Sequence, residues 1–215
     1  MMRAFWQGTC LAAGLVAAPM SPALAHPHAW IDFDVELRFD GEERITAMRQ
    51  VWLFDEFYTA FALQEIERDA DGGPSARGLE ALAQGNLERL EEYGYFTRLY
   101  AGTDAIAIDS VSDVETRVEG DRLLMAFTAE FAEGAPADRA FEYAIYDPTY
   151  WIEMLHTDGE ASIRLAGAPA GCEIELVDPT PSGEMVTLAA MLDVYETDSD
   201  GLGSAFAERV TIRCE

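Results

Sequence analysis

Apolar and polar residues alternate from Ala29 to Phe39. The odd positions are all apolar, while the even positions between them are mostly charged. Because successive side chains of a strand point to opposite faces of a sheet, this alternation predicts a half-buried strand. The Asp40-Gly41 pair is typical of a hairpin turn, and residues 44–54 are predicted to return as a second strand.

Two helices are predicted to follow this hairpin. Asp55 is a favourable N-terminal cap for the first helix. The apolar side predicted for this helix is formed by Phe57, Tyr58, Phe61, Leu63 and Ile66. Residues 68–78 are rich in Asp, Gly and Pro and predict an exposed loop. Leucines at helical spacing predict a second helix from about Leu79 to Tyr93.

Short strand-like segments separated by Gly, Pro and Asp residues occupy most of the remaining chain. They are residues 96–100, 105–108, 114–118, 123–131, 141–146, 151–155, 162–165, 172–177 and 208–214. A last helix is predicted over 184–194 and a loop over 197–203. This order of elements indicates an α+β fold, a mainly antiparallel β-sheet system with two or three helices.

The first 25 residues have the three parts of a secretory signal. Arg3 gives a positive start, residues 9–20 form an apolar run, and residues 23–25 (Ala-Leu-Ala) match an A-x-A cleavage site. The apolar run is too short to span a bilayer. We therefore expect residues 1–25 to be a removed signal peptide and residues 26–215 to form a single periplasmic domain.

The chain is strongly acidic. It has 40 Asp and Glu residues against 14 basic residues, all of them arginine, and its formal charge of −26 becomes one unit more negative without Arg3. Such a charge disfavours nucleic acids and anionic membrane surfaces as partners. The sequence after the leader contains no basic amphipathic helix, so we expect no direct membrane insertion once the leader is removed. Cations are the natural partners, although solubility or salt adaptation also explains acidity of this size.

Two cysteines remain after the leader, Cys172 and Cys214. Both lie in strand-like segments, so that adjacent strands can bring them within bonding distance. An even pair in an exported protein is typical of a disulfide, which for a loop of this length stabilises a fold by about 3–4 kcal/mol. The two residues do not form the C-x-x-C pattern of a thiolate metal site.

A histidine pair follows the predicted cleavage site directly. Removal of the leader would place His26 at the N-terminus, where its free amine and its imidazole can chelate one metal ion. His28 lies on the same strand face and offers another imidazole, and Asp32 lies further along that face. Pro27 excludes the square-planar copper or nickel site of X-X-His termini, which needs an ionisable amide at the second residue. Nitrogen ligands favour zinc, nickel, cobalt or copper over calcium or magnesium.

Other interpretations of the histidines remain open. The His26-Pro27-His28 segment is also compatible with a frayed, solvated chain end. His156 either completes a metal site, if its strand lies beside the first strand, or makes an ordinary polar contact. The common catalytic patterns G-x-S-x-G, P-loop, G-x-G-x-x-G and H-E-x-x-H do not occur in the sequence.

Five blocks of sequence, in a fixed order, carry a family resemblance. They are residues 26–32 (HPHAWID), 52–58 (WLFDEFY) with 61–63 (FAL), 146–152 (YDPTYWI), 167–172 (GAPAGC) and 202–210 (LGSAFAERV) with Cys214. These blocks resemble the bacterial exported family known as domain of unknown function 1007, with a departure at Trp151 and Glu153. The resemblance implies a periplasmic component of a transport system, similar to proteins that accompany NicO-type permeases for nickel, cobalt or zinc.

The residues and the resemblance together lead us to expect a metal-binding accessory protein, not an enzyme. It would capture a divalent transition metal, with zinc as the first choice, and work with an inner-membrane metal permease. The expected ligands are His26 and His28, completed by Asp32, Asp147 or His156. Two other functions remain open. One is a copper-dependent enzyme that uses the terminal-histidine chelate and needs a third nitrogen ligand. The other is an interaction module that stabilises or gates the permease without metal.

Overall fold

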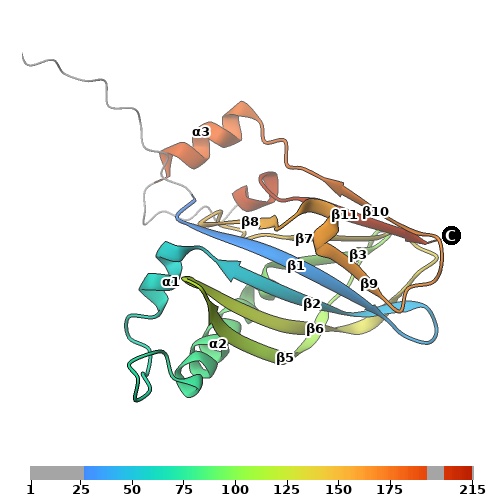
Figure 1. Ribbon diagram of the computed structural model, residues 1–215. Coiled ribbons are helices and arrows are strands. Elements are labelled where there is room, and N and C mark those ends of the chain that lie inside the picture. The colour runs from blue at the N-terminus through green and yellow to red at the C-terminus, as the bar shows by residue number, and fades with distance from the viewer. Residues whose placement is uncertain (1–26, 193–200, 215) are drawn as a thin grey trace, which may run out of the picture.

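A computed structural model describes residues 27–192 and 201–214 and contains two facing β-sheets (Figure 1). The six-stranded sheet has the order β5 (Ile108–Glu119), β6 (Arg122–Pro136), β2 (Arg44–Phe54), β1 (Ala29–Phe39) and β8 (Ile152–His156), and β9 (Ile163–Ala166) also pairs with β1. The five-stranded sheet has the order β10 (Cys172–Val177), β11 (Arg209–Cys214), β7 (Phe141–Ile145), β3 (Thr97–Ala101) and β4 (Asp104–Ala105).

Pairing is antiparallel except where β1 meets β8 and β9, which run parallel to it one after the other. The predicted α+β class with a mainly antiparallel sheet system is therefore confirmed. The bounds predicted for β1 and β2 match the structure, and the buried residues of β1 are its odd, apolar positions up to Leu37.

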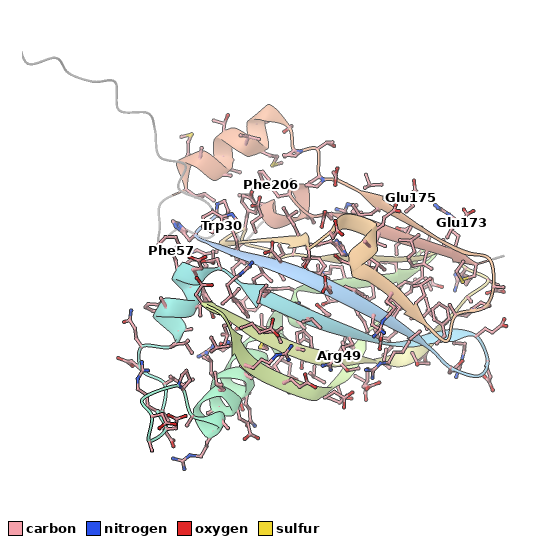
Figure 2. All side chains as sticks on the ribbon, viewed as in Figure 1. Trp30, Arg49, Phe57, Glu173, Glu175 and Phe206 are labelled. Carbon is pink, nitrogen blue, oxygen red and sulfur yellow. A yellow bond between two sulfur atoms is a disulfide. The ribbon has the colours of Figure 1, made fainter. Side chains whose placement is uncertain are left out.

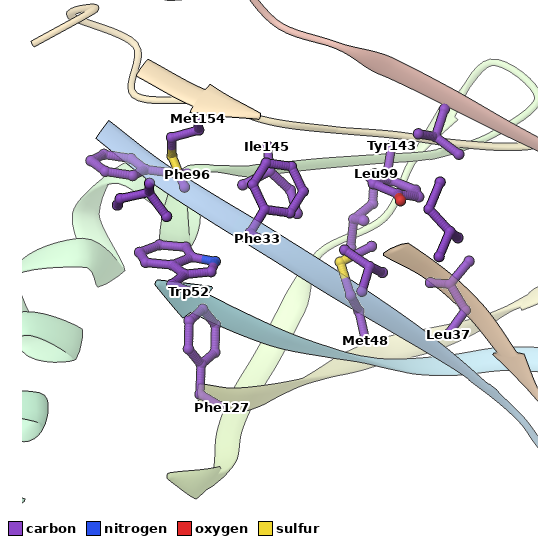
Figure 3. Close-up of a cluster of buried hydrophobic side chains, with 14 of the residues drawn as sticks. Phe33, Leu37, Met48, Trp52, Phe96, Leu99, Phe127, Tyr143, Ile145 and Met154 are labelled. Carbon is purple, nitrogen blue, oxygen red and sulfur yellow. The ribbon is translucent and has the colours of Figure 1, made fainter. Parts of the chain in front are cut away.

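The core lies between the two sheets (Figure 3). The indole of Trp52 on β2 packs edge to face against Phe127 on β6, with 5.2 Å between the ring centroids, and stacks on Phe96 at 6.2 Å. A buried polar link crosses the same layer. Trp52 Nε1 donates to Gln50 Oε1, and Gln50 Nε2 donates to Thr97 Oγ1 on β3. The link satisfies buried polar groups that would otherwise destabilise the core.

Three α-helices and three short 3₁₀ helices complete the described structure. They are α1 (Glu56–Ala62), α2 (Ala76–Leu90), α3 (Gly183–Met191), η1 (Glu91–Phe96), η2 (Gly159–Ser162) and η3 (Leu202–Ala205). As predicted, Asp55 caps α1, since its carboxylate accepts hydrogen bonds from two backbone amides of the first turn. Helix α2 starts three residues earlier than predicted, where the Ser75 hydroxyl accepts from the Gly78 amide.

The apolar side predicted for α1 is wrong in part. Phe57 and Phe61 are 83% and 72% exposed, and the buried residue of the helix is Thr59. The Thr59 hydroxyl accepts a hydrogen bond from the Leu123 amide of β6, and the ring of Tyr58 stacks on Phe54. A helix of seven residues has one narrow buried face, and this hydrogen bond places Thr59 on it.

Two other predicted segments differ from the structure. The predicted strand 114–118 lies inside the longer strand β5, which has pairing irregularities at 108–110 and 112–115. The predicted strand 105–108 is not one strand, because residue 105 ends β4, residues 106–107 lie in no strand and residue 108 begins β5. The last predicted helix, 184–194, ends at Met191 in the structure. The predicted signal peptide, His26 and part of the predicted loop 197–203 lie outside the described residues.

The predicted disulfide is confirmed. Cys172 on β10 and Cys214 on β11 face each other across the antiparallel pair and are bonded. Across the two described stretches, no helix is both long enough and apolar enough to cross a membrane.

Candidate functional site

His28 lies at the start of β1, at one end of the six-stranded sheet. Its backbone amide donates to the carbonyl oxygen of Trp151 at 2.8 Å, and the ring centroids of the two side chains are 5.4 Å apart. The residue is half-buried. Its position is thus fixed by the turn that precedes β8, while His26, its predicted partner, is not among the described residues.

The Asp147 side chain forms hydrogen bonds within that turn. The carboxylate is 4% exposed and accepts hydrogen bonds from the Thr149 amide, the Thr149 hydroxyl and the Ile152 amide, at 2.8–3.0 Å. Both oxygens are therefore engaged in holding the turn that carries Trp151. Through these hydrogen bonds, Asp147 positions the turn before β8, and His28 contacts that turn.

The 3₁₀ helix η3 packs closely on the same turn. A Cβ atom added to Gly203 would lie 1.8 Å from the backbone oxygen of Asp147, so the two segments touch at a place where only glycine fits. The Tyr150 and Phe206 rings stack with their centroids 3.9 Å apart. Burial is the main cause that raises the pKa of the Tyr150 hydroxyl, and the nearby Glu153 carboxylate raises it further.

Asp32 faces the same side of β1 as His28 but lies four residues away, about 13 Å along a strand. Its carboxylate pairs with the Arg122 guanidinium at 2.7 Å. That guanidinium also donates to the carbonyl oxygens of Leu53 and Phe54. The structure therefore places Asp32 in an ion pair with β6 and does not bring it to His28.

His156 lies between the two sheets, with its side chain almost fully buried. Its Nδ1 is 2.7 Å from a carboxylate oxygen of Glu208, and its Nε2 is 2.9 Å from the Tyr143 hydroxyl. The same Glu208 oxygen accepts from the His156 backbone amide at 2.7 Å. Of the two interpretations left open by the sequence, the structure shows the polar contact.

The strand register explains the separation of the histidines. In the parallel pair of β1 and β8, Ala29 is opposite Ile152 and Phe33 is opposite His156. His156 therefore lies near the level of Phe33, five residues or about 16 Å along β1 from His28. The Phe33 ring covers the imidazole at a centroid distance of 4.3 Å.

Four of the five ligands predicted from the sequence, namely His28, Asp32, Asp147 and His156, are described, and the structure does not gather these four in one place. Within 27–192 and 201–214, no group of three or more His, Cys, Asp or Glu side chains is arranged to hold a metal ion. Sequence reasoning missed Glu208 and Tyr143. Glu208 lies two residues before Val210 and four before Ile212, so it belongs to the buried, apolar face of this segment. An acidic residue at such a position was the signal that could have indicated a buried polar contact.

An exposed aromatic surface lies next to the start of β1 (Figure 2). Trp30 is 43% exposed, and its amide and carbonyl both bond to Asp55, the cap of α1. These bonds hold the start of β1 beside α1, whose Phe57 and Phe61 are the exposed residues described above. We call Trp30, Phe57 and Phe61 the aromatic patch.

Comparison with known proteins places this chain in a family. A protein of Haemophilus influenzae (strain ATCC 51907 / DSM 11121 / KW20 / Rd), described as an uncharacterized protein, is 24% identical over 196 residues, which cover 89% of this chain and 92% of the relative. The model of the family described as "Protein of unknown function (DUF1007)" matches residues 11–214, nearly the full length. The chain therefore belongs to the DUF1007 family.

Proposed function

We propose that this protein is a periplasmic metal-capture protein that binds a divalent transition metal at its N-terminus and works with an inner-membrane metal permease. The observation that carries the proposal is the fixed position of His28. The amide of His28 bonds to Trp151, so the histidine that follows His26-Pro27 is held at the rim of a rigid sheet. A terminal chelate built on a fixed residue loses less conformational freedom on binding than one on a loose chain end.

The proposed ligands are the amine and imidazole of His26 and the imidazole of His28. Asp32, Asp147 and His156 are already engaged with other groups, so they are not part of this ligand set. Zinc prefers four ligands, and three nitrogens leave a position for water or for a ligand from a partner. An open position suits a protein that passes its metal on. Nickel, cobalt and copper accept the same nitrogen ligands.

The experiment compares zinc binding by calorimetry for versions of the protein that begin at different residues. A version that begins at His26 should bind zinc, and an extra alanine before His26 should weaken binding about tenfold or more, because the amine is replaced by an amide. His28→Ala should weaken binding as well. Asp34→Ala, an exposed change on the same face of β1, serves as the control and should have no effect. Equal affinity in all four versions would refute the proposal.

A second candidate, an interaction module that needs no metal, is favoured by the aromatic patch. Exposed large aromatic side chains are frequent in protein interfaces and costly to leave in water. A photo-crosslinking residue at position 57 should form an adduct with an integral membrane protein in intact cells, whereas the same residue at position 173 should not. Loss of the adduct in a Phe61→Ser variant would tie it to the patch. Metal-independent formation of the adduct would favour this candidate over the first.

A copper-dependent enzyme receives less support. Such a site needs a third nitrogen close to the terminal chelate. Both ring nitrogens of His156 are occupied by Glu208 and Tyr143, and the ring is covered by Phe33.

A further inference from the structure

A groove runs between α2 and β5, on a part of the molecule that plays no role in the proposed metal site. Its volume is about 610 Å³, within the range of ligand-binding sites. The floor is apolar and includes Leu79, Ala83 and Leu87 from α2 and Val111 from β5. Figure 1 shows α2 beside β5, the edge strand of the six-stranded sheet.

The groove is long. Its lining follows α2 from Ala76 to Glu91, a rise of about 22 Å at 1.5 Å per residue. An extended peptide of six or seven residues has this length. A compact small molecule would fill only part of this length, so the length of the groove fits a chain segment.

The charged side chains of the groove are all acidic. Glu80, Glu88 and Glu91 line it, and its lining contains no arginine. In the described parts of the chain none of the three glutamates forms an ion pair, although several other glutamates do. Glu80 and Glu88 lie eight residues apart on α2, about 12 Å along its axis. This spacing matches basic side chains three or four residues apart on an extended peptide.

The edge of β5 limits how a ligand can bind. Its pairing with β6 is irregular around 112–115, where Asp113 has a left-handed backbone (φ 50°) and Val114 is 45% exposed. Bulges of this kind prevent a further strand from continuing the sheet. A ligand is therefore held through side chains. Tyr95, just beyond the C-terminal end of α2, also lines the groove.

We propose that this groove binds an extended segment of a partner protein in which apolar side chains alternate with arginine or lysine. The apolar side chains of the segment contact the floor between α2 and β5. The basic side chains pair with Glu80, Glu88 and Glu91. This inference is independent of the metal site, because His28 does not line the groove.

The test uses a fluorescein-labelled peptide of seven residues that alternates leucine and arginine, and measures its binding to the whole protein by fluorescence anisotropy. The double change Glu80→Gln with Glu88→Gln should weaken binding about tenfold, which corresponds to two partly exposed ion pairs. Val114→Arg, an exposed position on the opposite wall, should weaken it by at least as much. Both variants should keep the unfolding midpoint of the parent protein.

The matched control removes the same number of charges elsewhere. Glu142→Gln with Glu173→Gln changes two exposed residues of the five-stranded sheet and should leave binding unchanged. Equal weakening by this control would show general attraction to an acidic protein and overturn the proposal. Equal binding of a leucine and glutamate peptide, or full competition by spermidine at the same concentration, would overturn it as well. Dimerisation that blocks the peptide would assign the groove to a second copy and also overturn it.

Discussion

The imidazole of His156 lies 2.7 Å from the carboxylate of Glu208, 52 residues later in the chain, and this pair joins the two sheets. His156 ends β8 in the six-stranded sheet, while Glu208 immediately precedes β11 in the five-stranded sheet. A carboxylate only accepts hydrogen bonds, so the contact with Glu208 fits a proton on Nδ1; in the neutral tautomer of this kind Nε2 accepts from the Tyr143 hydroxyl. One Glu208 oxygen, the two ring nitrogens of His156 and the Tyr143 hydroxyl are all engaged at this crossing, and removal of one member leaves its partner without that contact.

Replacement of Glu208 should destabilise the fold strongly. Glu208→Leu leaves the imidazole and the His156 amide without their acceptor, and we expect the free energy of unfolding to fall by about 3 kcal/mol. Glu208→Gln keeps one acceptor and should cost less. Glu173→Leu, on an exposed strand position, should change stability by less than about 0.5 kcal/mol. Urea unfolding measures all three, and a Glu208→Leu protein as stable as its parent would contradict the described network.

The protein should lose stability in alkaline solution partly through Tyr143. Burial raises the pKa of the Tyr143 hydroxyl well above its usual value, and the negative charge of Glu208 raises it further. An unfolded tyrosine has a pKa of about 10, so below pH 10 both states keep the proton and the contribution is fully present. Above pH 10 only the unfolded state releases it, and stability falls by about 1.4 kcal/mol per pH unit for this residue.

Tyr143→Phe tests this pH dependence. The variant should be less stable at pH 8 because it lacks the hydrogen bond to His156, but its stability should fall less steeply between pH 10 and 11. Burial also raises the pKa of Tyr58, so part of the slope should remain. Identical slopes of urea-unfolding free energy against pH for both proteins would count against a buried neutral tyrosine.

Loss of the disulfide should destabilise the protein by about 3–4 kcal/mol. The bond between Cys172 and Cys214 closes a loop of 42 residues and limits the freedom of the unfolded chain. The double change Cys172→Ser with Cys214→Ser removes it. A reducing agent should lower the urea midpoint of the parent protein and leave that of the double variant unchanged. An effect of the reductant on both proteins would point to a cause other than this bond.

Gly203→Ala should be among the most damaging small changes. The added methyl group would lie 1.8 Å from the Asp147 backbone oxygen, so η3 must move away from the turn that holds Trp151. We expect a loss of about 2 kcal/mol or more, from backbone displacement and lost packing. Gly183→Ala, where a Cβ meets no atom within 4 Å, is the matched control and should be neutral or slightly stabilising. Thermal unfolding of both variants distinguishes the two positions.

Local patterns predicted much of the fold because their cause is local. Period-two alternation indicates which face of β1 is buried, and the capping chemistry of Asp55 indicates where α1 begins. Cys172 and Cys214 were paired correctly because β10 and β11 are both strong strand signals. The exposed face of α1 was not predictable in this way, since its two phenylalanines have a spacing that is typical of a buried side.

The candidate site was less accessible to sequence reasoning because it depends on register. Whether His156 lies near His28 is decided by the register in which β1 pairs with β8. The sequence of neither strand indicates this register. The role of Glu208 required knowledge that β8 and the start of β11 lie against each other from different sheets. Asp147 was predicted from the sequence as a metal ligand, and in the structure its carboxylate accepts hydrogen bonds within the turn that it occupies.

The order in which strands meet in the six-stranded sheet has a consequence for biosynthesis. Among the described residues, β1 is the first strand to be synthesised, and β2, which follows it directly, pairs with one of its edges. Its other edge stays unpaired until β8 and β9 are synthesised, and these strands follow more than a hundred residues later. Until then a long strand with one apolar face has a row of backbone amides and carbonyls that can pair with another chain. We therefore expect the six-stranded sheet to be completed only when almost the whole chain is available.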